Sequence, residues 1–113
     1  MKKFSFVRGD TFPFKVKINA EATITKDNIS TLFVTCRKAP SKKSPVLFQK
    51  TLDDIEISDN YIHIVFEPKD TEELEYGVYC FDLELTTKEG YKKTKYGEFE
   101  ITNETTITEK VGG

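Results

Sequence analysis

The stretch that decides the fold is DTEELEYGVYCFDLEL, residues 70–85. Its first half is polar and ends at Gly77, which predicts a turn or a single helical turn. From Gly77 onward apolar and polar residues alternate, as on a strand with one buried face. The side chains expected on the buried face are Tyr79, Phe81, Leu83 and Leu85, and those on the other face are Cys80, Asp82 and Glu84. The stretch therefore predicts a corner that leads into a half-buried strand.

Period-two alternation also runs through the rest of the chain. It predicts strands near residues 4–6, 12–18, 29–38, 46–51, 61–66, 78–87 and 91–101, with turn residues at intervals of about 8 to 12 residues. Pro13 predicts an edge position or a bulge, and Gly97 predicts a bulge. Residues 20–24 are expected to form a short extra strand. No segment of helix length is periodic, so we expect an all-β sandwich or small barrel.

Length and composition bound the class of protein. The 113 residues suffice for one two-layer domain, which we place at residues 1–102, followed by a polar tail at 103–113. The net charge of −2 gives no overall attraction for nucleic acid or an anionic membrane. No apolar run reaches the roughly 20 residues that cross a bilayer. The first six residues carry the charges of a signal peptide without its apolar region, so we expect folding in a cytoplasm.

The two cysteines are expected to be free thiols. Cys36 shares its face with Leu32 and Val34, whereas Cys80 shares its face with Asp82 and points the other way. A bond between the sheets would need both sulfur atoms in the core. The facing of the two residues therefore predicts that they do not pair.

No pattern in the chain predicts a catalytic, cofactor or metal site. His63, the single histidine, lies within an expected strand and has no cysteine near it in sequence. Nucleophile elbows and phosphate-binding glycine loops are absent. A calcium site is the alternative for the acidic residues Asp53, Asp54, Glu56 and Asp59, although their spacing does not match a calcium-binding loop. We therefore expect a protein that is not an enzyme and carries no cofactor.

Basic residues gather in two places in the sequence. One group contains Arg37, Lys38, Lys42 and Lys43, and the other contains Lys88, Lys92, Lys93 and Lys95. If the fold brings the groups together, they could meet a phosphate or an acidic partner. Lysines at strand edges also prevent aggregation, and this is the second interpretation.

The residues at the corner resemble those that enter a late strand of an immunoglobulin-like sandwich. In that corner a tyrosine near the start of the strand bonds to backbone upstream. The residues that match are Asp70, Thr71, Leu74, Gly77, Tyr79 and Phe81. The resemblance implies an immunoglobulin-like antiparallel β-sandwich of about seven strands.

Further fragments, in chain order, resemble small immunoglobulin-like structural proteins of tailed bacteriophages and prophages. They are similar to the N-terminal domain of the upper baseplate protein family. Before the corner these are Phe6-x-x-Gly9-Asp10-Thr11, Pro45-Val46-x-x-x-Lys50 and Glu67-Pro68, and after it Asp82, Thr94-x-x-Gly97-x-Phe99-x-Ile101 and Thr106. The chain departs from the pattern at Phe81, where tyrosine is expected, and at Thr105, where valine is expected.

The resemblance implies a non-catalytic subunit of a tail, a baseplate or a head accessory structure. Its partners would be other virion proteins or copies of itself, and it would be located in the virion after assembly in the host bacterial cytoplasm. We expect partner contacts at Phe4 and Phe6 in the opening strand and in the tail after Ile101. The alternative is an immunoglobulin-like module that binds carbohydrate or a cell surface, for which exposed tyrosines in one loop cluster would be needed. The candidates are Tyr61, Tyr76, Tyr91 and Tyr96.

Overall fold

The computed structural model describes residues 3–21 and 23–103. Within them the strands are β1 (Lys3–Val7), β2 (Phe12–Lys17), β3 (Ile29–Arg37), β4 (Val46–Thr51), β5 (Glu56–Ser58), β6 (Tyr61–Phe66), β7 (Gly77–Thr87) and β8 (Lys92–Thr102). The single turn of α-helix in this part of the chain is α1 (Pro68–Thr71), and short 3-10 helices cover Lys26–Asn28 and Leu52–Asp54. No described helix is long and apolar enough to cross a membrane.

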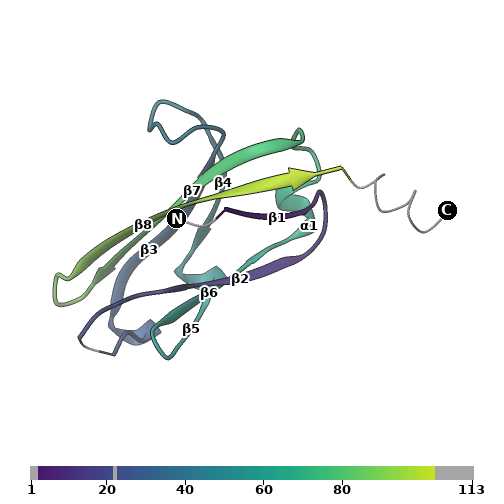
Figure 1. Ribbon diagram of the computed structural model, residues 1–113. Coiled ribbons are helices and arrows are strands. Elements are labelled where there is room, and N and C mark those ends of the chain that lie inside the picture. Colours follow the sequence, from purple (N-terminus) through teal and green to yellow (C-terminus); the bar gives the residue numbers. More distant parts are fainter. Residues whose placement is uncertain (1–2, 22, 104–113) are drawn as a thin grey trace.

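The strands form two sheets that face each other (Figure 1). The larger sheet has the order β1-β8-β7-β3-β4 and the smaller one the order β2-β6-β5. β1 runs parallel to β8, and the other pairs are antiparallel. The predicted immunoglobulin-like sandwich is confirmed, with eight strands in the described residues rather than about seven. Of the predicted tail at 103–113, only Asn103 belongs to the described residues.

The position of β2 explains how a proline fits into a strand. Pro13 lies opposite Val65 on β6, and the register is unbroken. The N–H of Ile18 donates to the carbonyl of Asn60. By alternation the even-numbered residues of β2 bond to β6, and the nitrogen of Pro13 faces away from it. Pro13 therefore marks an edge strand, and not a bulge.

The bulge predicted at Gly97 and the short strand predicted at residues 20–24 were both wrong. The predicted bulge at Gly97 is absent, because Gly97 lies opposite Phe81 in continuous register. The φ of Gly97 is not positive, so its backbone continues the strand. Register shifts lie instead at Cys36/Arg37 and Ile29/Thr31. The described part of residues 20–24 forms no strand, and Ala22 lies outside the described residues. Ile24 is buried, and its N–H donates to the side chain of Asn60 at 2.7 Å.

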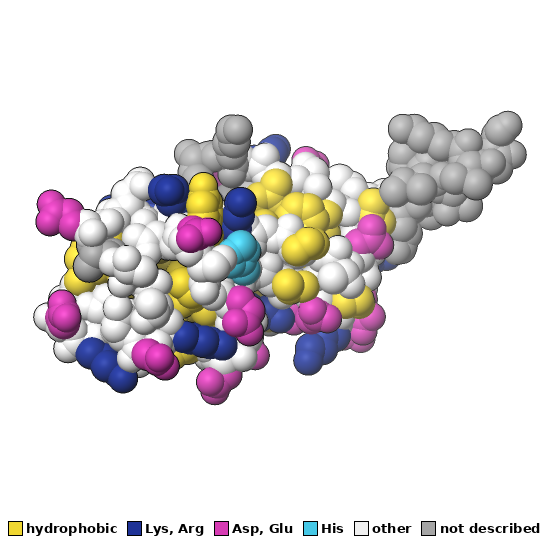
Figure 2. All heavy atoms as spheres, turned by 90° about the horizontal axis from the view of Figure 1, so that it is seen from below, with side chains coloured by type: hydrophobic (Ala, Val, Ile, Leu, Met, Phe, Trp, Pro, Cys, Tyr) yellow, Lys and Arg dark blue, Asp and Glu magenta, His cyan; other side chains and the backbone are white. Residues whose placement is uncertain are grey.

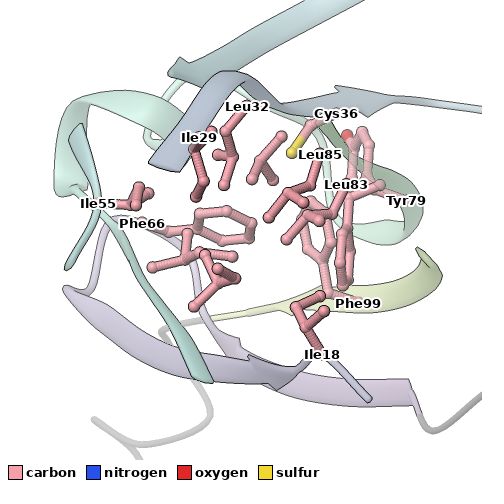
Figure 3. Packing of buried hydrophobic residues seen from close by; sticks show 14 of the residues in the cluster. Ile18, Ile29, Leu32, Cys36, Ile55, Phe66, Tyr79, Leu83, Leu85 and Phe99 are labelled. Atoms are coloured by element: carbon pink, nitrogen blue, oxygen red, sulfur yellow. The ribbon is translucent and has the colours of Figure 1, made fainter. Parts of the chain in front are cut away.

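The core confirms the predicted facing of β7. The side chains of Tyr79, Phe81, Leu83 and Leu85 are at most 5% exposed. Figure 3 shows Phe66, from β6, in the middle of the cluster between the two layers. Burial of each such side chain contributes roughly 1.5–3 kcal/mol. The facing of the cysteines is confirmed as well, because Cys36 is buried, Cys80 is half-buried on the other face, and both are free.

Phe4 and Phe6, the residues predicted for partner contacts, have their side chains in or against the core. Phe6 is 7% exposed, and Phe4 packs against the core. The ring centroids of Phe4 and Phe6 lie 4.9 and 4.7 Å from that of Phe12 on the opposite sheet. Both side chains face inward because β1 completes the larger sheet beside β8 and presents this face to β2. A partner contact at β1 stays a prediction, and it would use the outer backbone edge of this terminal strand rather than the two rings.

Candidate functional site

The corner before β7 is built around α1. Pro68 occupies the first turn, where its missing N–H costs nothing. The carboxylate of Asp70 accepts the N–H of Glu67 at 2.7 Å and thereby caps the turn. The local sequence thus places Asp70 and Thr71 between the ends of several strands.

Asp70 also pairs with a lysine from a distant strand. Its Oδ2 lies 2.5 Å from Nζ of Lys50 on β4, and the two side chains are only 9% and 10% exposed. A buried charge is costly unless it is paired, so each residue requires the other. This bond joins α1 to the larger sheet.

Thr71 connects the same turn to the start of the chain. Its side chain is fully buried, and Oγ1 accepts the N–H of Gly9 at 3.0 Å. Gly9 has a φ of 82°, which suits glycine. Arg8 donates to the carbonyl of Leu74 at 3.3 Å and lies over the ring of Tyr76. The turn between β1 and β2 is therefore bonded to the corner.

The tyrosine corner itself is present. The hydroxyl of Tyr79 donates to the carbonyl of Glu75 at 2.6 Å. Burial raises the pKa of this hydroxyl, and the charge of Glu75 raises it further. Nζ of Lys38 lies 4.3 Å from the ring centroid of Tyr79 and donates to the carbonyl of Val78. The predicted corner residues thus fix loops to one another and present no reactive group.

A groove lies on the outer face of the larger sheet, away from the corner. It measures about 540 Å³ and runs between the loop that joins β3 to β4 and the strands β7 and β8. The loop residues at its rim are Ala39, Pro40, Ser41 and Lys42. The sheet contributes Thr35, Arg37, Cys80, Phe81, Asp82, Glu84, Lys92, Thr94, Tyr96, Gly97 and Glu98.

A half-buried ion pair forms part of the groove. Nη1 of Arg37 lies 3.5 Å from Oδ2 of Asp82, and the side chains are 18% and 16% exposed. Oδ1 of Asp82 is enclosed, and among the described residues it has no hydrogen-bond partner. Burial raises the pKa of Asp82, Glu84 raises it further, and Arg37 and Lys42 oppose the shift. Sequence reasoning missed this pair, because its members lie 45 positions apart in strands of ordinary appearance.

The two basic groups meet only in part. Arg37 and Lys42 from the first group and Lys92 from the second line the groove, whereas Lys38 turns to the corner. Lys93 and Lys95 lie on the part of β8 that β1 does not pair with, since β1 covers only Glu98 to Thr102. Their position agrees with protection of a free edge.

The candidate tyrosines do not form a loop cluster. Tyr96 is 63% exposed on the outer face of β8 and lines the groove. Tyr61 lies on the other sheet beneath Lys15 and Lys17, and Tyr76 lies next to Arg8 at the corner. Tyr91 follows the turn between β7 and β8. The pattern required for a loop-based binding module is therefore absent from the described residues.

The acidic residues and His63 do not build a metal centre. Nε2 of His63 lies 2.9 Å from the hydroxyl of Ser58, and Asp54 accepts the N–H of Thr51 at 2.9 Å. That bond lowers the pKa of Asp54. Residues 3–21 and 23–103 contain no group of three side chains suited to hold a metal ion. Figure 2, which views the side that carries β2, β5 and β6, shows His63 among side chains of both charges.

Comparison with known proteins supports the fold and nothing narrower. No family model and no curated protein matches the chain. Among solved structures, the chain is similar to CopC from Methylosinus trichosporium OB3b, with a TM-score of 0.53 and 9% identity. The match covers 90% of this chain and 85% of that one. At this identity the likeness concerns the β-sandwich alone.

Proposed function

We propose that this domain is a non-catalytic assembly subunit of a phage or prophage virion, in a tail, a baseplate or a head accessory structure. The observation that carries the proposal is the bonded network around α1. Gly9 bonds to Thr71, Lys50 pairs with Asp70, and Tyr79 bonds to Glu75. The first two contacts join three fragments that are far apart in the sequence and on which the resemblance to virion proteins depends, and the third lies within the last of these fragments. Fragments that form each other's partners are stronger support than fragments that only occur in order.

The sheet edges suggest how such a subunit contacts its neighbours. β4 is a terminal strand of the larger sheet, and Val46 and Leu47 on it are 50% and 38% exposed. Its only charged residue, Lys50, points inward to Asp70. The outer strand β2, by comparison, presents the exposed residues Lys15 and Lys17. Edges without exposed charge favour strand addition, so β4 is the edge that we assign to a virion neighbour.

The test is assembly in a bacterium that carries the gene. Deletion of the gene should abolish complete particles, and the wild-type gene supplied in trans should restore them. The double substitution Val46→Lys/Leu47→Lys should fail to restore them while the purified domain stays folded. The matched control, Ser30→Lys/Thr31→Lys, adds the same charge to exposed positions of the inner strand β3 and should restore assembly. Normal particles after deletion would refute the proposal.

A further inference from the structure

We propose that the groove on the outer face of β3, β7 and β8 binds a neutral saccharide of two or three units. Tyr96 would be the stacking surface, and Arg37 with Asp82 would be the polar groups beneath it. This inference does not depend on the proposed function, because the groove and the corner share no residue of the bonded network. It differs from a loop-based site in that the ligand lies on a sheet face.

The size of the groove favours a small ligand. Its volume of about 540 Å³ falls in the range of roughly 300–1,000 Å³ that is typical of small-molecule sites. β3 and β7 are inner strands of the sheet, so their backbone groups are already paired on both sides. A peptide could not add to these strands. Among the described residues, β8 has a free edge at 92–97, but an edge pairs in the plane of the sheet, whereas the groove lies over its face. The groove therefore offers mainly side chains to its ligand.

The charges along the groove exclude a strongly ionic ligand. Three cations line it, Arg37, Lys42 and Lys92. Three carboxylates balance them, Asp82, Glu84 and Glu98. A phosphate would meet as many negative as positive groups, and so would a free cation. A ligand rich in hydroxyl groups suits this lining, because each hydroxyl can donate to a carboxylate and accept from an arginine or lysine.

One oxygen of the Asp82 carboxylate lacks a hydrogen-bond donor. Its Oδ2 lies near Arg37, but the enclosed Oδ1 lacks a partner among the described residues. An unpaired buried acceptor costs about 1–3 kcal/mol, so a hydroxyl that reaches it would be favoured. A ligand can reach this oxygen only if a neighbouring side chain moves. Lys42 is exposed at the rim and close enough to lower the pKa of Asp82, and exposed side chains of this kind change rotamer rapidly.

Tyr96 supplies the apolar surface. It is 63% exposed, more than any other large hydrophobic residue in the described part of the chain, and it lies directly opposite Asp82 in the ladder. The face of an aromatic ring packs against the C–H face of a pyranose while nearby polar groups bind its hydroxyls. An exposed ring beside an unsatisfied carboxylate provides both contacts in one place.

The rate at which the Cys80 thiol is labelled can show whether the groove is occupied. It lines the groove and is half-buried, whereas Cys36 is sealed in the core. Burial raises the pKa of both thiols, so labelling should be carried out with a maleimide at mildly alkaline pH. The native chain should react at Cys80 alone. A bound saccharide should slow that reaction.

The experiment screens the full chain on an array of neutral oligosaccharides, and the best di- or trisaccharide is then titrated by calorimetry and by protection of Cys80. We expect saturable binding and at least about a tenfold slower labelling at saturation. Tyr96→Ala should weaken binding by about tenfold or more, and Asp82→Asn should also weaken it. Tyr91→Ala, which removes another exposed tyrosine outside the groove, should leave binding unchanged.

Three outcomes would overturn the inference. The first is the absence of binding to any neutral oligosaccharide on the array. The second is binding that leaves the labelling rate of Cys80 unchanged. The third is equal loss of affinity in Tyr96→Ala and Tyr91→Ala. Circular dichroism of each variant separates loss of fold from loss of the site.

Discussion

The ion pairs Lys50–Asp70 and Arg37–Asp82 have the same chemistry, but their surroundings differ. Asp70 pairs with Lys50 and also caps the turn at Glu67. Asp82 lies 3.5 Å from Arg37 and keeps one oxygen without a partner among the described residues. A carboxylate whose bonds are used within the fold holds the fold together. A carboxylate with an unused oxygen beside a groove has capacity for a ligand. The same comparison separates the corner, which is structural, from the groove, which we assign to binding.

The largest effect is expected from Asp70→Asn. The substitution leaves the ammonium group of Lys50 buried without its counter-ion, so we expect a loss of about 3–5 kcal/mol in the free energy of unfolding. Urea denaturation followed by circular dichroism measures it. Asp53→Asn, at an exposed position in the 3-10 helix that follows β4, is the control and should change stability by less than ~0.5 kcal/mol. A similar small change for Asp70→Asn would mean that the pair does not stabilise the corner.

Tyr79→Phe tests the corner without altering its packing. The ring stays in the core, but the carbonyl of Glu75 loses its donor. We expect a loss of about 1–2 kcal/mol in the same denaturation experiment. Tyr91→Phe, at an exposed tyrosine, should be neutral. Equal effects of the two changes would show that the hydroxyl of Tyr79 contributes nothing specific.

Asp82→Asn tests the groove through pH dependence. Burial raises the folded-state pKa of Asp82 above its ordinary value of 3.8. Between the two values the folded state binds more protons than the unfolded state, so the contribution of Asp82 to stability falls as the pH rises through this window. The stability of the wild type relative to Asp82→Asn should therefore decrease from acidic to neutral pH.

Asp54→Asn is the matched control for this pH series. The pKa of Asp54 is lowered by the N–H of Thr51, so its contribution has the opposite sign and is lost as the pH falls. The effect should be small, because the group is exposed. If the stability of the wild type relative to Asp82→Asn instead increases with pH, the attraction of Arg37 outweighs the cost of burial for the Asp82 carboxylate.

The smallest effect is expected from Cys80→Ser. The thiol is half-buried on the outer face, so the free energy of unfolding should change by less than ~0.5 kcal/mol. Reaction with a maleimide should then be lost in the native state, because Cys36 is sealed, and should return in urea. Native labelling of Cys80→Ser would show that the core opens at Cys36.

The facing of residues along a strand could be predicted from the sequence, but their partners across space could not. Alternation identified Tyr79, Phe81, Leu83 and Leu85 as core residues and placed Cys80 on the other face, because a strand has only two faces. The corner motif anticipated the bond of the Tyr79 hydroxyl. For Phe4 and Phe6 the same alternation was present, but it did not say that β2 would cover that face. The groove could not be predicted from the sequence, because its lining comes from three strands and a loop that meet only in the folded state.

The parallel pairing of β1 with β8 has a consequence for synthesis of the protein. Lys3 lies opposite Glu98, and the N–H of Arg8 bonds to the carbonyl of Thr102. The ring of Phe4 lies 5.9 Å from that of Phe99. A nascent chain on the ribosome therefore cannot shield Phe4 and Phe6 with β8 until β8 itself has been translated. Contacts of such long sequence separation slow folding. A chain released before β8 is made would expose hydrophobic surface, and such an intermediate is prone to aggregation and is a substrate for chaperones and proteases.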